Sequence, residues 1–473
     1  MQDAAFHPLS KYLNPSIFLH KLCLIALISI VTACSSTRSY TKRYELIETA
    51  IQQKNYQKAI AKIEQDWKNN KYSEKDKILY YLDIGICYYY ADNYEKCIKN
   101  LELAERAIED AYTKSVSRAA TSILLNDNVL AYSGEDYEDI YLNIFKALSY
   151  LELNKFDDAF VEIRRINEKL QTLSLKYDNL ISQLNKSKNA KIKFKKGEIK
   201  FHNDALARYL SLLIYRAEEQ YDDARIDKEK IEQLWKIQKD LYYFNIPSAV
   251  ENSLANTKQT KLNVITFVGK GPEKYAVNRE IDTYENYIVI KGDKPEKFKD
   301  VIQADVKQGY HFRFSLPKIR KRNSVISNIE IYADDKRIGE LELLEDMSEI
   351  AIATYKVKEQ IIYLKSILRT VIKGVVAQKG KEKIRNQIDN PLLAVVTGKV
   401  VNAAVDLTEN ADLRGWRIIP GKCYVGEFVL PDGKHNFTIK YLDSANRLVE
   451  KKEIRDVEIK PNKLNLLTTF SYN

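Results

Sequence analysis

One frame of residues recurs in the first half of the chain and restricts the folds open to that half. In its fullest form, apolar and small residues alternate with polar ones at the spacing of two successive helices, with Ala91-Asp92-Asn93 between them as a turn. Small residues at Gly85 and Cys97 predict a close approach of the two helices. The residues that define the frame are Tyr81, Ile84, Gly85, Tyr88, Tyr94, Cys97, Leu101 and Ala104.

The same frame can be placed on three other segments. Their second helices are expected to begin at Tyr56-x2-Ala59, Phe156-Asp157-Asp158-Ala159 and Tyr221-Asp222-Asp223-Ala224, the last two preceded by Tyr150 and Tyr215. The frame resembles the tetratricopeptide consensus. Its steps from Ala59 through Cys97 and Ala159 to Ala224 are 38, 62 and 65 residues, longer than the usual period of about 34. We therefore expect extra structure between repeats.

Residues 44–245 are accordingly interpreted as a helical solenoid, with a plain helical bundle as the alternative. Stacked repeats of this kind leave a concave surface, and such surfaces mostly bind peptides or partner proteins. The lysine-rich stretch 186–200 is interpreted as an exposed, solvated hairpin or loop, with a phosphate- or lipid-binding patch as the alternative.

Lys21 to Ser36 has the pattern of a secretory signal: a basic flank, about a dozen mostly apolar residues, and small residues before Cys34. It resembles the bacterial lipobox, which implies cleavage before Cys34 and attachment of acyl chains such as palmitate there. The alternatives are a simple signal peptide or a short anchor helix. We expect a signal peptide at 1–33 and a lipidated linker at 34–43. Ser35 favours sorting to the outer membrane, facing the periplasm.

Composition excludes several classes of function. Of the 473 residues, 75 are Lys or Arg and 65 are Asp or Glu, and a net charge of +10 is too mild to indicate a nucleic-acid partner. Five cysteines and five histidines show no ligand spacing, so neither a metal nor a cofactor is expected. Cys87 and Cys97 are expected to be buried thiols, although a bridge between them is conceivable in the periplasm.

The second half of the sequence has a different pattern of apolar residues. Residues 246–354 contain apolar strand-like runs, residues 355–410 return to helical spacing, and residues 411–473 suggest a small antiparallel β-sandwich. Pro431-Asp432-Gly433-Lys434 is a hairpin signal within that last module. Within the helical segment, 394–404 is rich in small and β-branched residues and is expected to pack in the core, with an oligomer or membrane contact as the alternative. The expected fold class is α+β: an N-terminal solenoid, a mixed region and a C-terminal β-sandwich.

Two polar segments are candidates for binding a partner. In the first, Ser133 or Asp136 is expected to cap a helix, while Glu135 and Asp136 belong to an acidic cluster that could meet a basic peptide. In the second, Arg414 and Trp416 are either an exposed recognition site or part of the packing of the β module. No catalytic constellation is visible, and the consecutive acids at Asp157-Asp158 point in different directions from a helix.

The first segment, residues 126–138, runs into the repeat at residues 147–159, and the second is residues 411–420. Together with Phe267-Val268-Gly269-Lys270-Gly271-Pro272, they resemble an uncharacterised family of bacterial tetratricopeptide-like envelope lipoproteins. The resemblance implies no enzyme activity. It implies a scaffold or adaptor in cell-envelope assembly, held on the membrane by lipid and binding one or more envelope proteins. The alternatives are regulation of a peptidoglycan synthase or, from a different class, hydrolysis of peptidoglycan or another glycan. The sequence leaves the oligomeric state open.

Overall fold

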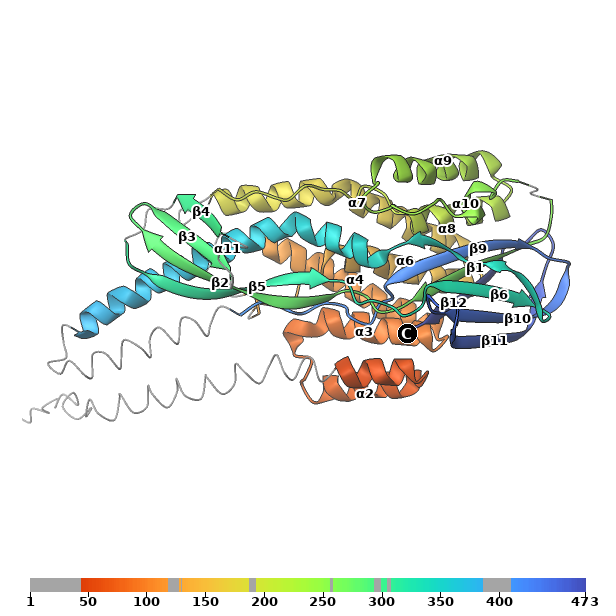
Figure 1. Ribbon diagram of the computed structural model, residues 1–473, viewed down its shortest axis with the longest axis horizontal. Coiled ribbons are helices and arrows are strands. Elements are labelled where there is room, and N and C mark those ends of the chain that lie inside the picture. Colours follow the sequence, from red (N-terminus) through yellow and green to blue (C-terminus); the bar gives the residue numbers. More distant parts are fainter. Residues whose placement is uncertain are drawn as a thin grey trace, which may run out of the picture.

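The computed structural model describes residues 44–117, 127–128, 130–186, 193–255, 258–292, 299–303, 308–385 and 410–473. The described chain is a mixed helix-and-sheet protein with two antiparallel sheets and one mixed sheet (Figure 1). The predicted signal peptide, Cys34 and the stretch 394–404 lie outside the described residues. Within them, no helix is both long and apolar enough to cross a membrane.

Four helical hairpins make up the first half. Each consists of two antiparallel helices joined by a turn of three residues, and the second helix of every pair begins with an aromatic residue. The helices are 44–52 with α2 (Tyr56–Lys68), α3 (Lys77–Tyr90) with α4 (Tyr94–Ser117), α6 (Asp136–Glu152) with α7 (Phe156–Asn185), and α8 (Ala205–Ala217) with α9 (Tyr221–Ile237).

The four turns share one backbone conformation. Their middle residues, Lys54, Asp92, Asn154 and Glu219, have φ values from 55° to 61°. In each turn the N–H of the next residue donates to the carbonyl five residues back, at Ala50, Tyr88, Tyr150 and Tyr215. This bond and the left-handed residue are typical of a helix ending in a Schellman motif. The repeated frame therefore corresponds to a repeated local structure.

Small residues set the distance between the helices of each hairpin. Ala59, Cys97, Ala159 and Ala224 are fully buried, three positions after the aromatic residue that opens each second helix. On the first helix of the second hairpin, a Cβ added to Gly85 would lie 2.7 Å from Cδ2 of Leu101. Since carbon atoms in contact need about 3.5–4.0 Å, any larger residue there would displace the Leu101 side chain.

The strands form three four-stranded sheets. The inner sheet has the order β12-β1-β9-β8, the outer sheet β11-β10-β6-β7, and the distal sheet β4-β3-β2-β5. The bounds are β1 (Lys261–Val268), β2 (Glu273–Tyr284), β3 (Tyr287–Gly292), β4 (Lys299–Gln303), β5 (His311–Arg320), β6 (Asn328–Ala333), β7 (Lys336–Glu340), β8 (Glu342–Glu345), β9 (Lys422–Val429), β10 (Gly433–Leu442), β11 (Leu448–Ile459) and β12 (Asn465–Ser471).

The inner sheet separates the helices from the outer sheet. Along β1, side chains alternate between the two sides: Val264 and Val268 join the core shared with the outer sheet, whereas Ile265 and Phe267 pack on the helices. The Phe267 ring lies 5.2 Å from Phe145 of α6, and Phe470 of β12 stacks on Tyr90 of α3 at 4.1 Å. The inner face of the hairpins is thus covered by the chain's own sheet.

The C-terminal strands do not form a module of their own. β12 pairs in parallel with β1, β9 pairs with β1 and β8, and β10 pairs with β6. The predicted boundaries at 354/355 and 410/411 therefore separate strands that belong to the same two sheets. The hairpin predicted at residues 431–434 is wrong. β9 and β10 belong to different sheets, and this turn carries the chain from the inner sheet to the outer one.

Helix α11 (Met347–Arg385) begins before residue 355, where a helix was predicted, and lies between α7 and the distal sheet (Figure 1). Ile367 and Val371 pack on that sheet, while Val357 and Ile361 pack with residues of α7. The described part of the lysine-rich stretch is pinned to this layer, because Phe194 is buried and the Gly197 N–H donates to the Val357 carbonyl. It is therefore not a free hairpin.

Candidate functional site

A cavity of about 300 Å³ lies where residues 130–136 meet α4, α7, α11 and residues 412–414. We call it the charged cavity. It brings together Glu135, Asp136 and Arg414, three of the four residues that the sequence suggested for partner binding. Its charged and aromatic lining consists of Asp127, Glu135, Asp136, Asp412, Lys114, Lys176, Lys274, Lys358, Lys365, Arg414, Tyr112, Tyr132, Tyr177 and Tyr355.

A larger groove of about 610 Å³ lies on the other side of α11 and shares Pro317 and Ile362 with the charged cavity. Its ion pairs are more open to water. Lys200 and Asp240, for example, retain 46% and 73% of their side-chain exposure. Exposed pairs of this kind form and break at little cost, whereas Glu135 and Asp136 of the charged cavity are buried. The charged cavity is therefore the stronger candidate.

The two adjacent acids of the cavity are neutralised by lysines from distant segments. Glu135 is 4% exposed and forms ion pairs with Lys274 of β2 and Lys358 of α11. Asp136 is bound by Lys176 at 2.6 Å and by the Tyr177 hydroxyl, both on α7. The acidic cluster is thus closed to a basic peptide, because its carboxylates already have cationic partners within the chain.

Glu138 lies behind Glu135 and is fully buried. Its carboxyl group accepts hydrogen bonds from the Tyr132 hydroxyl at 2.8 Å, the Glu135 N–H at 3.0 Å and the Trp416 N–H at 2.7 Å. Burial, and then the charge of Glu135, raise the pKa of Glu138 to about 7. This side chain therefore exchanges a proton near neutral pH.

The start of α6 differs from the prediction. The helix begins at Asp136 and its capping residue is Glu135, with Glu138 reaching back to the Glu135 N–H. Ser133 stands outside the helix, since Gly134 at φ 78° turns the chain before Glu135. Asp136 does lie in the first turn, where a negative charge is stabilised by the helix dipole.

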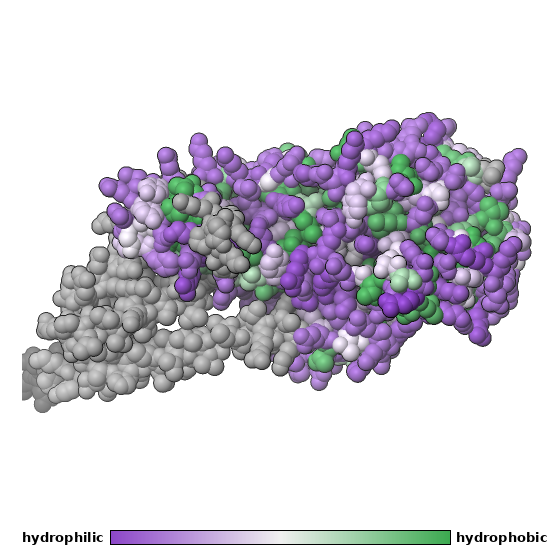
Figure 2. Space-filling model, viewed as in Figure 1, coloured by the Kyte–Doolittle hydropathy of each residue, from purple (hydrophilic) through white to green (hydrophobic). Residues whose placement is uncertain are grey.

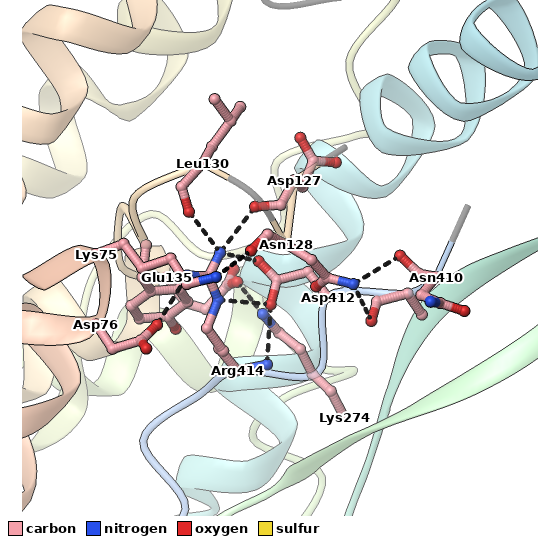
Figure 3. Close-up of polar contacts among 12 residues, drawn as sticks. Lys75, Asp76, Asp127, Asn128, Leu130, Glu135, Lys274, Asn410, Asp412 and Arg414 are labelled. Carbon is pink, nitrogen blue, oxygen red and sulfur yellow. Dashed lines mark hydrogen bonds and ion pairs between the residues drawn. The ribbon is translucent and has the colours of Figure 1, made fainter. Parts of the chain in front are cut away.

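Arg414 ties three segments together (Figure 3). Its guanidinium group bonds to Asp412 at 2.8 and 2.9 Å, to Asp76 at 2.9 Å, and to the carbonyl oxygens of Asp127 and Leu130 at 2.8 and 3.1 Å. Burial alone would lower the pKa of Arg414, but Asp412 and Asp76 raise it above its usual range. Arg414 therefore positions the cavity wall and has little left to offer a partner.

Trp416 is fully buried. Its ring lies edge-on to Phe145 of α6 with 6.2 Å between the ring centroids, at the junction of the helices and the inner sheet. The alternative of an exposed recognition site is wrong for this residue, because no part of its side chain reaches the surface.

The lysines of the cavity lie against aromatic rings. Lys274 Nζ is 5.6 Å from the ring centroids of both Tyr132 and Tyr355, and Lys176 Nζ is 5.3 Å from that of Tyr112. Such cation–π contacts favour the charged form. Burial would lower the pKa of Lys176 and of Lys358, but the neighbouring carboxylates raise both above the ordinary value. Lys176 and Lys358 therefore keep their positive charges at neutral pH.

Sequence reasoning missed the lysines that complete the site. Lys358 and Lys365 stand seven residues apart, on one face of α11, between the apolar residues Tyr355, Ile361 and Ile362. Lysines on an otherwise apolar helix face can indicate a buried charged site from the sequence. Lys274 gives no such sequence signal, because only the pairing of β2 with its neighbours brings it to the cavity.

No group of three or more metal-ligating side chains occurs among the described residues. Cys87, Cys97 and Cys423 are free and buried, which leaves the cavity without a thiol.

Comparison with known proteins gives no match: no family model, curated protein or solved structure is significantly similar to this chain.

Proposed function

We propose that this chain is a lipid-anchored envelope protein that acts as a scaffold or adaptor by binding a segment of a partner protein. The lipobox-like sequence at Cys34 supports the anchor on the periplasmic side of the outer membrane. The four hairpins, with their shared turns and buried small residues, support a tetratricopeptide-like N-terminal unit.

The observation that carries the proposal is the convergence of distant segments on the charged cavity. Loop 130–136, α7, α11, β2 and residues 412–414 each supply charged side chains to one concavity. Concave sites with a few convergent polar groups are the usual location of ligand binding. Because the inner sheet covers the inner face of the hairpins, the cavity replaces the concave surface of a repeat array as the binding site.

In-cell crosslinking tests this proposal. The C-terminally tagged protein is crosslinked in its native host beside a Cys34→Ala variant, and captured proteins are identified by mass spectrometry. We expect a reproducible envelope partner that is lost when the variant leaves the membrane fraction. If the wild-type protein and the variant fractionate alike and neither captures a partner, both the anchor and the scaffold role are wrong.

A further inference from the structure

The charged cavity has more positive than negative side chains. Six basic and four acidic residues line it, and two of the acids are each shared between two cations. Glu135 pairs with Lys274 and Lys358, and Asp127 pairs with Lys365 at 3.2 Å and with Arg369 at 3.6 Å. Lys358 and Lys365 therefore each share their carboxylate with a second cation.

Lys114 adds a cation at the edge of the cavity. It is exposed on the last turn of α4, and no acidic partner for it is found among the described residues. Because Lys114 is exposed and holds no buried carboxylate, its side chain can move over a bound anion at little cost to the fold. For the same reason, substituting it leaves no buried charge unpaired.

The remaining wall of the cavity is apolar. Leu180, Leu184 and Tyr177 of α7 pack in one cluster with Ile361 of α11, and all four line the cavity together with Tyr355 and Ile362. This lining suits a ligand that carries an apolar group as well as a negative charge. A volume of about 300 Å³ lies at the lower end for ligand sites, which suits one large side chain and its neighbour rather than a long acyl chain.

We propose that the charged cavity binds an acidic peptide segment in which a carboxylate stands next to a large apolar side chain. The carboxylate lies between Lys358, Lys365 and Lys114, and the apolar side chain lies against Leu180 and Ile361. This inference rests on the proposed function and specifies the chemistry of the partner's segment. The lysines at residues 274, 358 and 365 come from outside the helical hairpins, so this site is distinct from the covered face of the repeats.

Selection from a library of random dodecapeptides tests the inference, using the full lipidated protein in nanodiscs. Enriched peptides should share Asp or Glu beside Phe, Leu or Trp, and their binding should weaken as salt is raised. In the double variant Lys114→Gln/Lys365→Gln, affinity for the best peptide should fall at least tenfold. Arg369 still neutralises Asp127 in that variant, so the fold should be kept.

The matched control is Lys236→Gln/Lys239→Gln, which removes the same charge from exposed positions beyond the cavity and should bind within twofold of wild type. No enrichment, a basic consensus, or equal loss in both double variants would overturn the inference. So would binding to phosphatidylglycerol vesicles that depends on Lys114 and Lys365 without a peptide consensus. An in-cell partner found alongside any of these results would leave the scaffold role standing, whereas a consensus without an in-cell partner would refute the scaffold role instead.

Discussion

The backbone N–H of Trp416 donates a hydrogen bond to Glu138 Oε1 across 2.7 Å, joining residues 278 positions apart in the chain. Glu138 belongs to the most buried helix of the hairpins, and Trp416 belongs to the segment that leads into the inner sheet. The same carboxyl group holds Tyr132 and the start of α6. One side chain therefore fixes the wall of the charged cavity to the contact between the helices and the sheet.

This bond predicts a pH dependence of stability. Because the pKa of Glu138 is raised to about 7 from an ordinary 4.5, the native state holds a proton between these values that the unfolded chain has lost. The free energy of unfolding should then fall as the pH rises from about 4.5 to about 7, by at most about 1.4 kcal/mol per pH unit. Glu138→Gln resembles the protonated form and should make this slope less steep in urea titrations between pH 5 and 8, while the raised pKa of Asp204 and of Glu345 keeps part of it. An unchanged slope, judged against exposed Glu95→Gln, would contradict the prediction.

A buried ion network between α4, α6 and α7 predicts a large loss of stability. Lys146 is 1% exposed and its Nζ lies 2.8 Å from both Glu105 and Glu162. Lys146→Met leaves these buried carboxylates with less positive charge, and we expect it to lower the free energy of unfolding by about 3–5 kcal/mol. Denaturant unfolding measures this, with Arg225→Met in an exposed pair as the control. A difference below about 1 kcal/mol between the two variants would show that the network contributes little.

The close contact of Gly85 with Leu101 predicts that substitutions at these two residues have coupled effects on stability. A Cβ there would lie 2.7 and 2.9 Å from Leu101 Cδ2 and Cγ, so Gly85→Ala should destabilise the protein by about 1–3 kcal/mol through overpacking. Leu101→Ala should relieve part of that cost in the double variant. At Gly415 a Cβ would lie 3.5 Å from Tyr137 Oη and 3.6 Å from Glu138 Oε1, which are ordinary contact distances, and Gly415→Ala is the matched control. Additive effects of the changes at residues 85 and 101 would disprove the coupling.

The reactivity of the cysteine thiols tests both their burial and the processing of the chain. Burial raises the pKa of Cys97 to about 12 and that of Cys87 and Cys423 above the ordinary range, so native protein should not react with Ellman's reagent. In denaturant, the processed protein should show three reactive thiols, because Cys23 leaves with the signal and Cys34 carries lipid. Five thiols, the number in the full sequence, would indicate an unprocessed chain, and fewer than three would indicate a disulfide bond.

Much of the helical half could be predicted from the sequence, since its signals are local. An aromatic residue followed three positions later by Ala59, Cys97, Ala159 or Ala224 marks each second helix, and both features depend on neighbours within one hairpin. The strands were harder to place because their partners are remote. Leu262 pairs with Asn465, about 200 residues away, and Pro431-Asp432-Gly433 reads locally as a hairpin although its two strands belong to different sheets.

The site could also be predicted only in part, because its interacting residues are remote in the sequence. Glu135, Asp136 and Arg414 stood out as charges in distinctive segments, but their partners Lys176, Lys274 and Lys358 are single lysines on long elements. Only tertiary packing brings these lysines to the carboxylates. It also reverses the expectation for the ligand, because an acidic segment in the sequence becomes a cavity with surplus positive charge. The surface seen in Figure 2 is mostly hydrophilic with small separate hydrophobic patches. This face does not indicate a binding site as the charged cavity does.

Site-specific photocrosslinking in living cells tests the central claim most directly. A benzoylphenylalanine placed at Leu180, in the charged cavity, is compared with one at Ile226, which is 40% exposed on α9. We predict that the probe at residue 180 captures an envelope protein and the probe at residue 226 does not, and that capture disappears in the Cys34→Ala variant. Capture from residue 226 alone, or from neither position, would contradict a membrane-tethered adaptor that binds its partner in the charged cavity.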